Sequence, residues 1–532
     1  MLTGICSPQS VRFIPTTTAR GGTARKMGEL HNNIQPIIDK DDHGSPLFIH
    51  FEHVPSNFVR VIIYFGADAV PLHLKPLLSL YTMNLLTSPV MRDGKRIEFE
   101  DVVLDLERET VAYSVSSVAE LNTLAFETEP ENYERIISWI KTILFDAIHD
   151  PERLFSSLTK LLADIPDEKR SGGSMMSSVN AMIQYKPESS IRATSTLSKA
   201  LYLKRIKKLL DADKDAVRSQ LTELCKALHR PENFRIYVAA NLEKLQKPVS
   251  AWQTLIADLD TTKPLEPILS RKEMLSEVGL NPGSTAYIVP MSTINSSFAM
   301  MATKGPEGYD HPDLPALMIA TAYMNGVEGP LWVAVRGTGL AYGVGFSRSA
   351  ETGLVYLKIT RSPDSFKAFT AAKEQVEGYA TGKIELNKFA LEGAVSEIVL
   401  GMADEQPTMA SAAAYSFANQ VLRGISKDWS HQMLAKVQAV TPNQIREAMK
   451  KYMVPIFQPE SSNLIITCAQ IMKDGLHEKF TDAGYNPEVR ALESFQDDYG
   501  LEGPPADEGG DDEDESDDDG EFEDTPDSSE EN

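Results

Sequence analysis

A short glycine-rich segment carries the two side chains of this 532-residue sequence that are best suited to chemistry. Arg336 and Tyr342 lie in the run Arg336-Gly337-Thr338-Gly339-Leu340-Ala341-Tyr342-Gly343. An arginine can donate two parallel hydrogen bonds to carbonyl oxygens, and a tyrosine hydroxyl can donate to a developing oxyanion. The pattern alone also allows a purely structural role, in which Arg336 forms a local salt bridge and Tyr342 belongs to the core.

Other familiar catalytic patterns do not occur in the sequence. The run His50-Phe51-Glu52-His53 is β-like, which would turn its two imidazoles to opposite faces of a strand, and neither His149 nor His229 has a second histidine nearby. No G-x-S-x-G elbow is present, and the glycine-rich run lacks the Lys-Ser/Thr of a phosphate loop. The sequence therefore predicts no metal ligand in this chain, and its histidines are interpreted as surface or core residues.

Composition limits the class of protein and its compartment. The hydrophobic fraction is 42%, no apolar run approaches the roughly 20 residues of a membrane span, and the three cysteines are far apart. We expect a soluble chain without a disulfide framework, in the cytoplasm. The mitochondrial matrix is the alternative, because residues 1–26 contain four basic side chains and no acid.

The net charge of −24 is concentrated at one end of the chain. Residues 491–532 hold 20 Asp or Glu and no Lys or Arg, so −24 + 20 leaves about −4 for the rest. A nearly neutral body gives no support to nucleic-acid binding. The acidic stretch is predicted to be disordered, as a solubilising tail or as a docking segment for a basic partner.

The two halves of the body repeat each other, mostly at an offset of 240 residues. Ser56-Asn57-Phe58 and Ser296-Ser297-Phe298 each begin an apolar strand that a helix follows. Matching predictions in the two halves are strands 107–118 and 354–360, helices 133–148 and 366–381, closing helices 215–228 and 443–452, and final strands 234–239 and 464–468. The fold class is therefore α+β, with two tandem copies of one domain whose antiparallel-rich sheet packs against helices.

Proline and glycine between residues 261 and 282 mark the boundary between the copies. The predicted organisation is a disordered or extended lead-in at 1–44, a first domain at 45–262, a linker at 263–284, a second domain at 285–475 with the Arg336/Tyr342 loop, and a tail at 476–532, disordered from about 491.

A known family matches the order of these residues. Glu328-Gly329-Pro330-Leu331-Trp332, followed by Val335-Arg336-Gly337-Thr338-Gly339-Leu340-Ala341-Tyr342-Gly343, resembles the carboxy-terminal half of the pitrilysin/insulinase zinc metallopeptidases, and within them the presequence-protease branch. The resemblance covers roughly residues 45–475. It implies four similar α/β domains in two halves that enclose a chamber for unfolded peptides.

The resemblance also implies roles for the two side chains. Arg336 would hold the substrate backbone, and Tyr342 would stabilise the oxyanion at the scissile carbonyl. The inverted H-x-x-E-H zinc motif of the amino-terminal half is missing from this chain, so the partners it implies are a peptide substrate and a zinc-bearing half. This chain is then inactive by itself.

Three interpretations of this missing motif remain open. The chain is part of a longer peptidase, or a natural half-enzyme that binds a zinc-bearing subunit, or a non-catalytic scaffold of the same fold. A binding protein that acts through its acidic tail is the alternative from another class. The retention of Arg336 and Tyr342 favours a peptidase origin, because a scaffold does not need an oxyanion donor.

Overall fold

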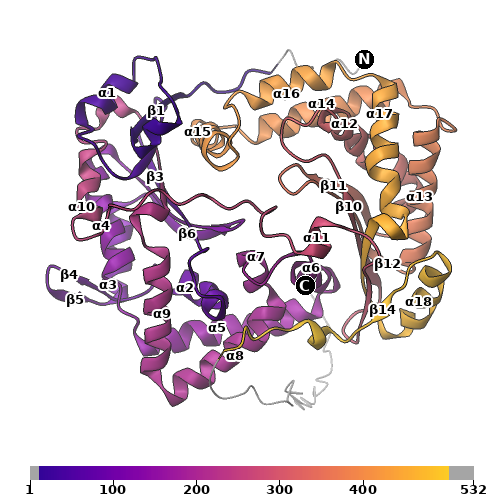
Figure 1. The fold of residues 1–532 in the computed structure, drawn as a ribbon, viewed down its shortest axis with the longest axis horizontal. Helices are drawn as coiled ribbons and strands as arrows, with labels where there is room; N and C mark the ends of the chain where they lie inside the picture. The colour runs from indigo at the N-terminus through magenta and orange to yellow at the C-terminus, as the bar shows by residue number, and fades with distance from the viewer. Residues whose placement is uncertain (1–10, 502–532) are drawn as a thin grey trace, which may run out of the picture.

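The computed structural model describes residues 11–501, in which two six-stranded sheets face each other and helices surround their outer sides (Figure 1). Residues 1–10 and 502–532, which include most of the predicted acidic tail, lie outside the described residues. The architecture is mixed α/β, as predicted from the sequence.

The first sheet has the strand order β1-β2-β8-β3-β7-β6. Strands β2 and β8 are parallel, and every other neighbouring pair in this sheet is antiparallel. Strand β3 pairs Val61 with Phe126 of β7 and with Val238 of β8. The strands are β1 (Thr17–Gly22), β2 (Phe48–His53), β3 (Val59–Gly66), β6 (Ala112–Val118), β7 (Leu121–Thr128) and β8 (Phe234–Ala240).

The second sheet repeats this plan. Its order is β11-β12-β10-β13-β9-β14, so that β10, β13, β9, β12 and β11 take the places of β3, β8, β2, β7 and β6. The counterpart of the parallel pair is β9 beside β13. The strands are β9 (Ala286–Met291), β10 (Ser297–Lys304), β11 (Gly343–Ser349), β12 (Leu354–Ser362), β13 (Ser462–Ala469) and β14 (Glu488–Val489).

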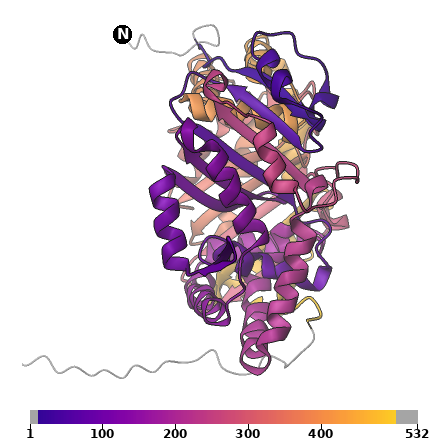
Figure 2. The same ribbon diagram turned by 90° about the vertical axis from the view of Figure 1, so that its left-hand side faces the viewer.

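Amphipathic helices cover the outer sides of the sheets (Figures 1 and 2). In α4 (Tyr133–Phe145), buried Tyr133, Ile136, Ile137 and Ile140 follow the helical period and pack into the first core. Among the helices of residues 11–501, none is both long and apolar enough to span a membrane. Other helices of the first half are α1 (Gln35–Asp41), α2 (Leu78–Asn84), α3 (Phe99–Glu109), α5 (Pro151–Arg170), α6 (Gly172–Gln184), α7 (Ser190–Ala193), α8 (Thr196–Ala212), α9 (Lys214–Leu228) and α10 (Gln253–Ile256).

The helices of the second half follow the same pattern. They are α11 (Glu277–Leu280), α12 (Leu314–Asn325), α13 (Ser365–Thr381), α14 (Lys388–Asp404), α15 (Met409–Phe417), α16 (Trp429–Gln438), α17 (Pro442–Ala448) and α18 (Lys473–Asp482). Helix α13 lies where the sequence predicted a helix at 366–381. Helix α17 continues as a π-helical turn at Met449–Met453, which together match the predicted closing helix.

The predicted correspondence between strands 107–118 and 354–360 of the two halves is wrong. The stretch 107–118 is not one strand, because α3 extends to Glu109 before β6 begins at Ala112. The counterpart of β6 in the second sheet is β11, whereas the predicted strand 354–360 is β12, the counterpart of β7. Polar and apolar residues alternate both at the end of α3 and in β6, so the sequence pattern does not show where the helix ends and the strand begins.

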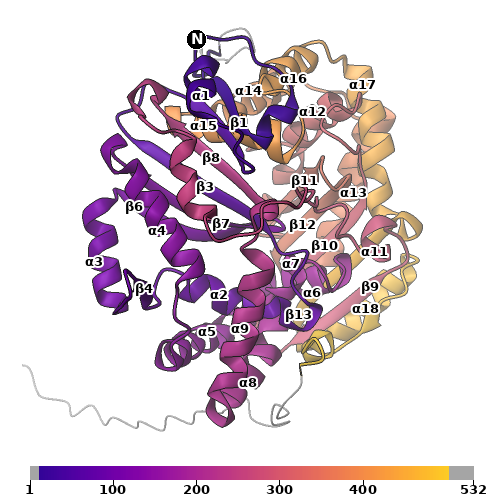
Figure 3. The ribbon, with the colours of Figure 1, turned by 60° about the vertical axis from the view of Figure 1, so that its left-hand side comes forward.

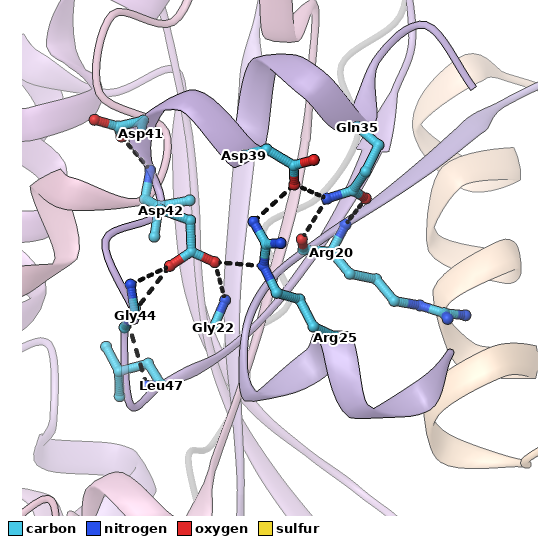
Figure 4. Close-up of polar contacts among 11 residues, drawn as sticks. Arg20, Gly22, Arg25, Gln35, Asp39, Asp41, Asp42, Gly44 and Leu47 are labelled. Carbon is cyan, nitrogen blue, oxygen red and sulfur yellow. Dashed lines mark hydrogen bonds and ion pairs between the residues drawn. The ribbon is translucent and has the colours of Figure 1, made fainter. Parts of the chain in front are cut away.

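The lead-in, predicted at 1–44 as disordered or extended, contains regular elements from Thr17 onward. Strand β1 joins the sheet edge, with Thr17 opposite His53 of β2. The Asp42 carboxylate accepts hydrogen bonds from the Gly22 amide and the Arg25 side chain, each at 2.7 Å (Figure 4). These hydrogen bonds and the ion pair lower the pKa of Asp42, although burial opposes them. Charged contacts distant in sequence fix this segment, and a local pattern does not reveal them.

The beginning of the predicted tail is ordered as well. Strand β14 adds to β9, and the segment after it returns to the first domain. Leu492 and Phe495 pack between the halves, while Tyr499 and Leu501 join the first core. Arg192 pairs with Asp497 at 3.0 Å, and Arg205 pairs with Asp498. The prediction of disorder from about residue 491 is therefore wrong up to Leu501. It treated Asp497 and Asp498 as part of a solvated acidic tail, whereas both pair with arginines of the first domain.

The two halves exchange helices across the space between the sheets (Figure 3). Helix α6 from the first half packs on the inner face of the second sheet, where the Thr467 hydroxyl donates to the Gly172 carbonyl at 2.8 Å. Helix α15 from the second half packs on the first sheet, where the Phe417 ring lies 4.9 Å from the rings of Tyr64 and Tyr237. Each half therefore completes the core of the other.

A buried carboxylate fixes the contact of α15 with the first sheet. Glu52 accepts hydrogen bonds at 2.8 Å from Thr18, His50 and Ser416 and at 3.2 Å from Gln420. Burial raises the pKa of Glu52, but these hydrogen bonds and the attraction of His50 outweigh burial and leave the pKa lowered. The carboxylate is therefore charged at neutral pH, and two of its partners come from the other half.

We predict that Glu52→Gln lowers the free energy of unfolding by about 3 kcal/mol at neutral pH, because it removes the negative charge that strengthens the four hydrogen bonds to this carboxylate. A lowered pKa stabilises the fold above the unfolded value of about 4.3, and this contribution disappears as the pH falls through the lower folded value. Urea unfolding between pH 3 and 7 measures this dependence. The matched control Glu134→Gln removes an exposed pair with Lys247 and should cost less than about 1 kcal/mol. Equal effects of the two substitutions would contradict the account.

Candidate functional site

The segment with Arg336 is a π-helical turn rather than an open loop. The turn covers Trp332–Arg336 and is anchored by the fully buried side chains of Leu331 and Val335. The chain then reverses at Gly339, whose φ of 76° lies in the left-handed region that favours glycine. Strand β11 begins at Gly343, where a Cβ would lie 2.6 Å from the Thr360 hydroxyl. The turn and the strand thus hold the two predicted side chains on a short, rigid frame.

The structure brings Arg336 and Tyr342 together. The Arg336 guanidinium carbon lies 4.8 Å from the centre of the Tyr342 ring, a cation–π contact. The Tyr342 side chain is 59% exposed, so it does not belong to the core. Within residues 11–501, neither side chain has a hydrogen-bond or ion-pair partner that would compete with a ligand. Both are free to donate to oxygen atoms of a bound molecule.

Arg361 joins this pair, and sequence reasoning did not find it. Its carbonyl accepts the Tyr342 amide at 3.2 Å, and its guanidinium carbon lies 5.7 Å from the Tyr342 ring. The φ of Arg361 is 49°, and Glu328 before the turn has a φ of 57°, both unusual for residues other than glycine. Backbone strain of this kind is common at binding sites. No local pattern in the sequence marks Arg361.

A cavity of about 840 Å³ lies beside this cluster. Arg361 and Phe298 of the second half line it together with Arg170 at the end of α5 and with Ser171 and Gly172 at the start of α6. Arg170 pairs with Asp167 at 3.4 Å, with both side chains exposed. The cavity is therefore bounded by both halves and by two guanidinium groups. Such a surface suits a chain with many carbonyl oxygens, because arginines donate to them through several N–H groups.

The described histidines and cysteines lie away from this cluster, some at the surface and some in the core. His229 bonds Tyr81 at 2.8 Å, and burial lowers its pKa to about 4. Cys225 lies 3.8 Å from His149, and burial raises the pKa of its thiol to about 12. His53 accepts the Leu242 amide. Among residues 11–501, no group of three or more His, Cys, Asp or Glu could hold a metal ion, so the side chains present do not fit a zinc site.

Comparison with known proteins shows similarity to one peptidase family over part of the chain. Residues 215–392 match the family model described as the peptidase M16 inactive domain, a stretch that runs from α9 into α14 and includes Arg336 and Tyr342. The chain is 29% identical to an uncharacterized protein of Schizosaccharomyces pombe over 512 residues, which is 92% of this chain and 49% of that protein. It is 25% identical to an uncharacterized protein of Saccharomyces cerevisiae, covering 93% of this chain and 50% of the yeast protein. This chain therefore spans about half the length of these relatives.

Solved structures share the fold. A protease from Helicobacter pylori matches 79% of this chain and 97% of its own, with a TM-score of 0.59 and 11% identity. A peptidase M16 inactive domain from Pseudomonas fluorescens matches 80% and 96%, at the same TM-score and 15% identity. The periplasmic protease PqqL from Escherichia coli matches 79% of this chain and 44% of its own, with a TM-score of 0.59 and 12% identity. The predicted resemblance to the carboxy-terminal half of a pitrilysin-type (M16) protein is confirmed.

We predict that Gly339→Ala lowers the free energy of unfolding by about 1 kcal/mol, because alanine disfavours the left-handed backbone of this turn. No atom lies within 4 Å of the added Cβ, so backbone strain alone sets the cost. Gly401→Ala in the exposed part of α14 also meets open space but lacks the positive φ, and it should instead stabilise by about 0.5 kcal/mol. Urea unfolding of the two variants measures the difference. An unchanged stability for Gly339→Ala would show that the turn does not need this conformation.

Proposed function

We propose that this chain is the substrate-holding half of a zinc metalloendopeptidase that degrades unfolded peptides. The observation that carries the proposal is the Arg336/Tyr342 pair, in which an exposed phenol and a guanidinium lie side by side without competing partners in residues 11–501. The peptidase M16 match over the same residues supports it.

Each side chain has a distinct task in this proposal. The Arg336 guanidinium binds backbone carbonyl oxygens of an extended peptide and holds it against the second sheet. The Tyr342 hydroxyl donates to the scissile carbonyl oxygen as negative charge develops there. Arg361, whose guanidinium also lies near the ring, orients the phenol and adds positive charge to the surface that receives the peptide. Folded proteins are excluded, because only an extended chain can reach both groups in a closed chamber.

The zinc ion of this enzyme belongs to an amino-terminal half that this chain does not contain. When bound there, zinc supplies the activated water for hydrolysis. The residues of this chain bind and orient the peptide and donate hydrogen bonds to it. The partner is either another part of the same polypeptide or a separate subunit. We place the complex in the cytoplasm, because Cys225 and Cys468 are free thiols, which is typical of reducing compartments.

We predict that Arg336→Ala and Tyr342→Phe each reduce peptide turnover by about 10²-fold when the zinc-bearing half is present, because each removes one transition-state donor. For this assay, the chain is co-expressed with the part of the Schizosaccharomyces pombe relative that it does not cover. Cleavage of a quenched-fluorescent unfolded peptide gives kcat and KM.

The matched control is Arg108→Ala, which removes an exposed arginine of α3 whose ion-pair partner is Asp105 in the same helix. This variant should keep wild-type kinetics. Tyr342→Phe should lower kcat more than it raises KM, because the hydroxyl acts on the developing oxyanion. Unchanged turnover in both site variants would favour a non-catalytic scaffold of the same fold.

A further inference from the structure

A second cavity lies between the halves, away from the Arg336/Tyr342 cluster. It measures about 810 Å³ and is lined by the end of β11, the turn between β6 and β7, and helices α12, α15 and α16. Its walls include Phe346 and the aromatic rings of Tyr309, Tyr415 and Trp429. The volume is within the range of small-ligand sites, which combine apolar walls with a few polar groups.

Arg348 on β11 is the unusual polar group of this cavity. Its Nη1 donates to the Thr321 hydroxyl at 2.8 Å, and no carboxylate of the described chain lies within ion-pair distance of it. Burial lowers the pKa of Arg348 to about 10, and no neighbouring acid opposes that effect. The side chain is still charged at neutral pH. Arg348 is half-buried and has no acidic partner among the described residues, so its remaining N–H groups are available to an anion that enters the cavity.

A second arginine borders the same cavity. The Arg423 guanidinium carbon lies 5.5 Å from the ring of Tyr309 and 5.6 Å from that of Tyr415, and the side chain donates to Asn419 at 2.8 Å. In residues 11–501 it, too, lacks a carboxylate within ion-pair distance. The aromatic rings hold its planar group in place, which suits the recognition of a carboxylate.

Most carboxylates around the cavity have other partners. Glu351 accepts the Arg271 amide at 2.8 Å, Glu120 accepts Ser189 at 2.6 Å and Ser190 at 2.7 Å, and Glu307 pairs with Lys272. Glu405 is exposed at the rim. None of the four forms an ion pair with Arg348 in the described structure. Arg348 and Arg423 therefore lack an acidic partner in the described structure, although four glutamates also line the cavity.

We propose that this cavity binds a carboxylate of the peptide ligand, with Arg348 as the principal donor and Arg423 as a second donor. The aromatic walls then contact an apolar residue next to the acidic group. This inference rests on the proposed peptide-holding function and adds a preference for acidic peptides. The carboxylate comes from an acidic side chain or from the peptide carboxy terminus, and these sources share the same chemistry.

Three fluorescein-labelled 20-residue peptides without other charged residues test the proposal by anisotropy with the full chain. The first has one Glu between Leu and Tyr and an amidated end, the second has Gln in its place, and the third has Gln and a free carboxy terminus. The wild type should bind the first or third peptide about ten-fold more tightly than the second, because a charge-assisted hydrogen bond contributes about 1.5–3 kcal/mol. Whether the first or the third binds more tightly identifies the source of the carboxylate.

Arg348→Gln should remove this preference, and Arg348→Lys should retain part of it. Lys358→Gln, which removes an exposed cation from neighbouring β12, should leave the preference unchanged. Equal binding of all three peptides by the wild type, or a preference that survives Arg348→Gln, would overturn the inference and leave the peptide-holding function standing. Failure to bind any of the peptides would contradict both.

The stability of Arg348→Met gives a second readout. Replacing a half-buried charge that lacks an acidic partner by an apolar side chain of similar length should raise the midpoint of thermal unfolding. An arginine with a merely structural role would give the opposite result. A lower midpoint together with an unchanged peptide preference would show that Arg348 supports the fold and does not bind ligand.

Discussion

The exchange of helices α6 and α15 between the two halves is the contact on which the rest of the structure depends. Each sheet has an apolar inner face that its own half leaves uncovered, and the helix from the other half buries it. Phe417 packs against the inner face of the first sheet, and Met175 and Met176 of α6 pack against the inner face of the second. The two sheets are therefore held at a fixed separation, because neither can move without exposing the core of the other.

This constraint determines where ligands can bind. The cavity beside Arg361 includes the start of α6, and the cavity with Arg348 includes residues of α15. Both cavities thus lie where an exchanged helix meets the opposite half. The exchanged helices hold the two halves rigidly together. The short segment from Arg336 to Arg348 supplies three of the side chains that face a ligand, Arg336, Tyr342 and Arg348. A peptide that spans both cavities would contact the second sheet along the whole of β11.

Much of this architecture follows from the sequence, for identifiable reasons. The repeat of Ser56-Asn57-Phe58 in Ser296-Ser297-Phe298 predicted the duplicated sheets, because equivalent strands need the same apolar residues to fill equivalent cores. The Arg336/Tyr342 spacing identified the cluster, because the glycines between them permit a compact turn. The roles of Glu52, Arg361 and Arg348 could not be predicted in the same way. Their partners are distant in sequence, and only the fold shows which charges are buried or unpaired.

The most direct test of the account is whether a bound peptide contacts position 342. The chain would carry Tyr342→benzoylphenylalanine and be irradiated with a labelled unfolded peptide, with and without the zinc-bearing half. The account predicts a peptide adduct that excess unlabelled peptide suppresses and that a folded protein does not. An adduct to the zinc-bearing half alone, with no labelled peptide at this position, would contradict the claim that this chain holds substrate.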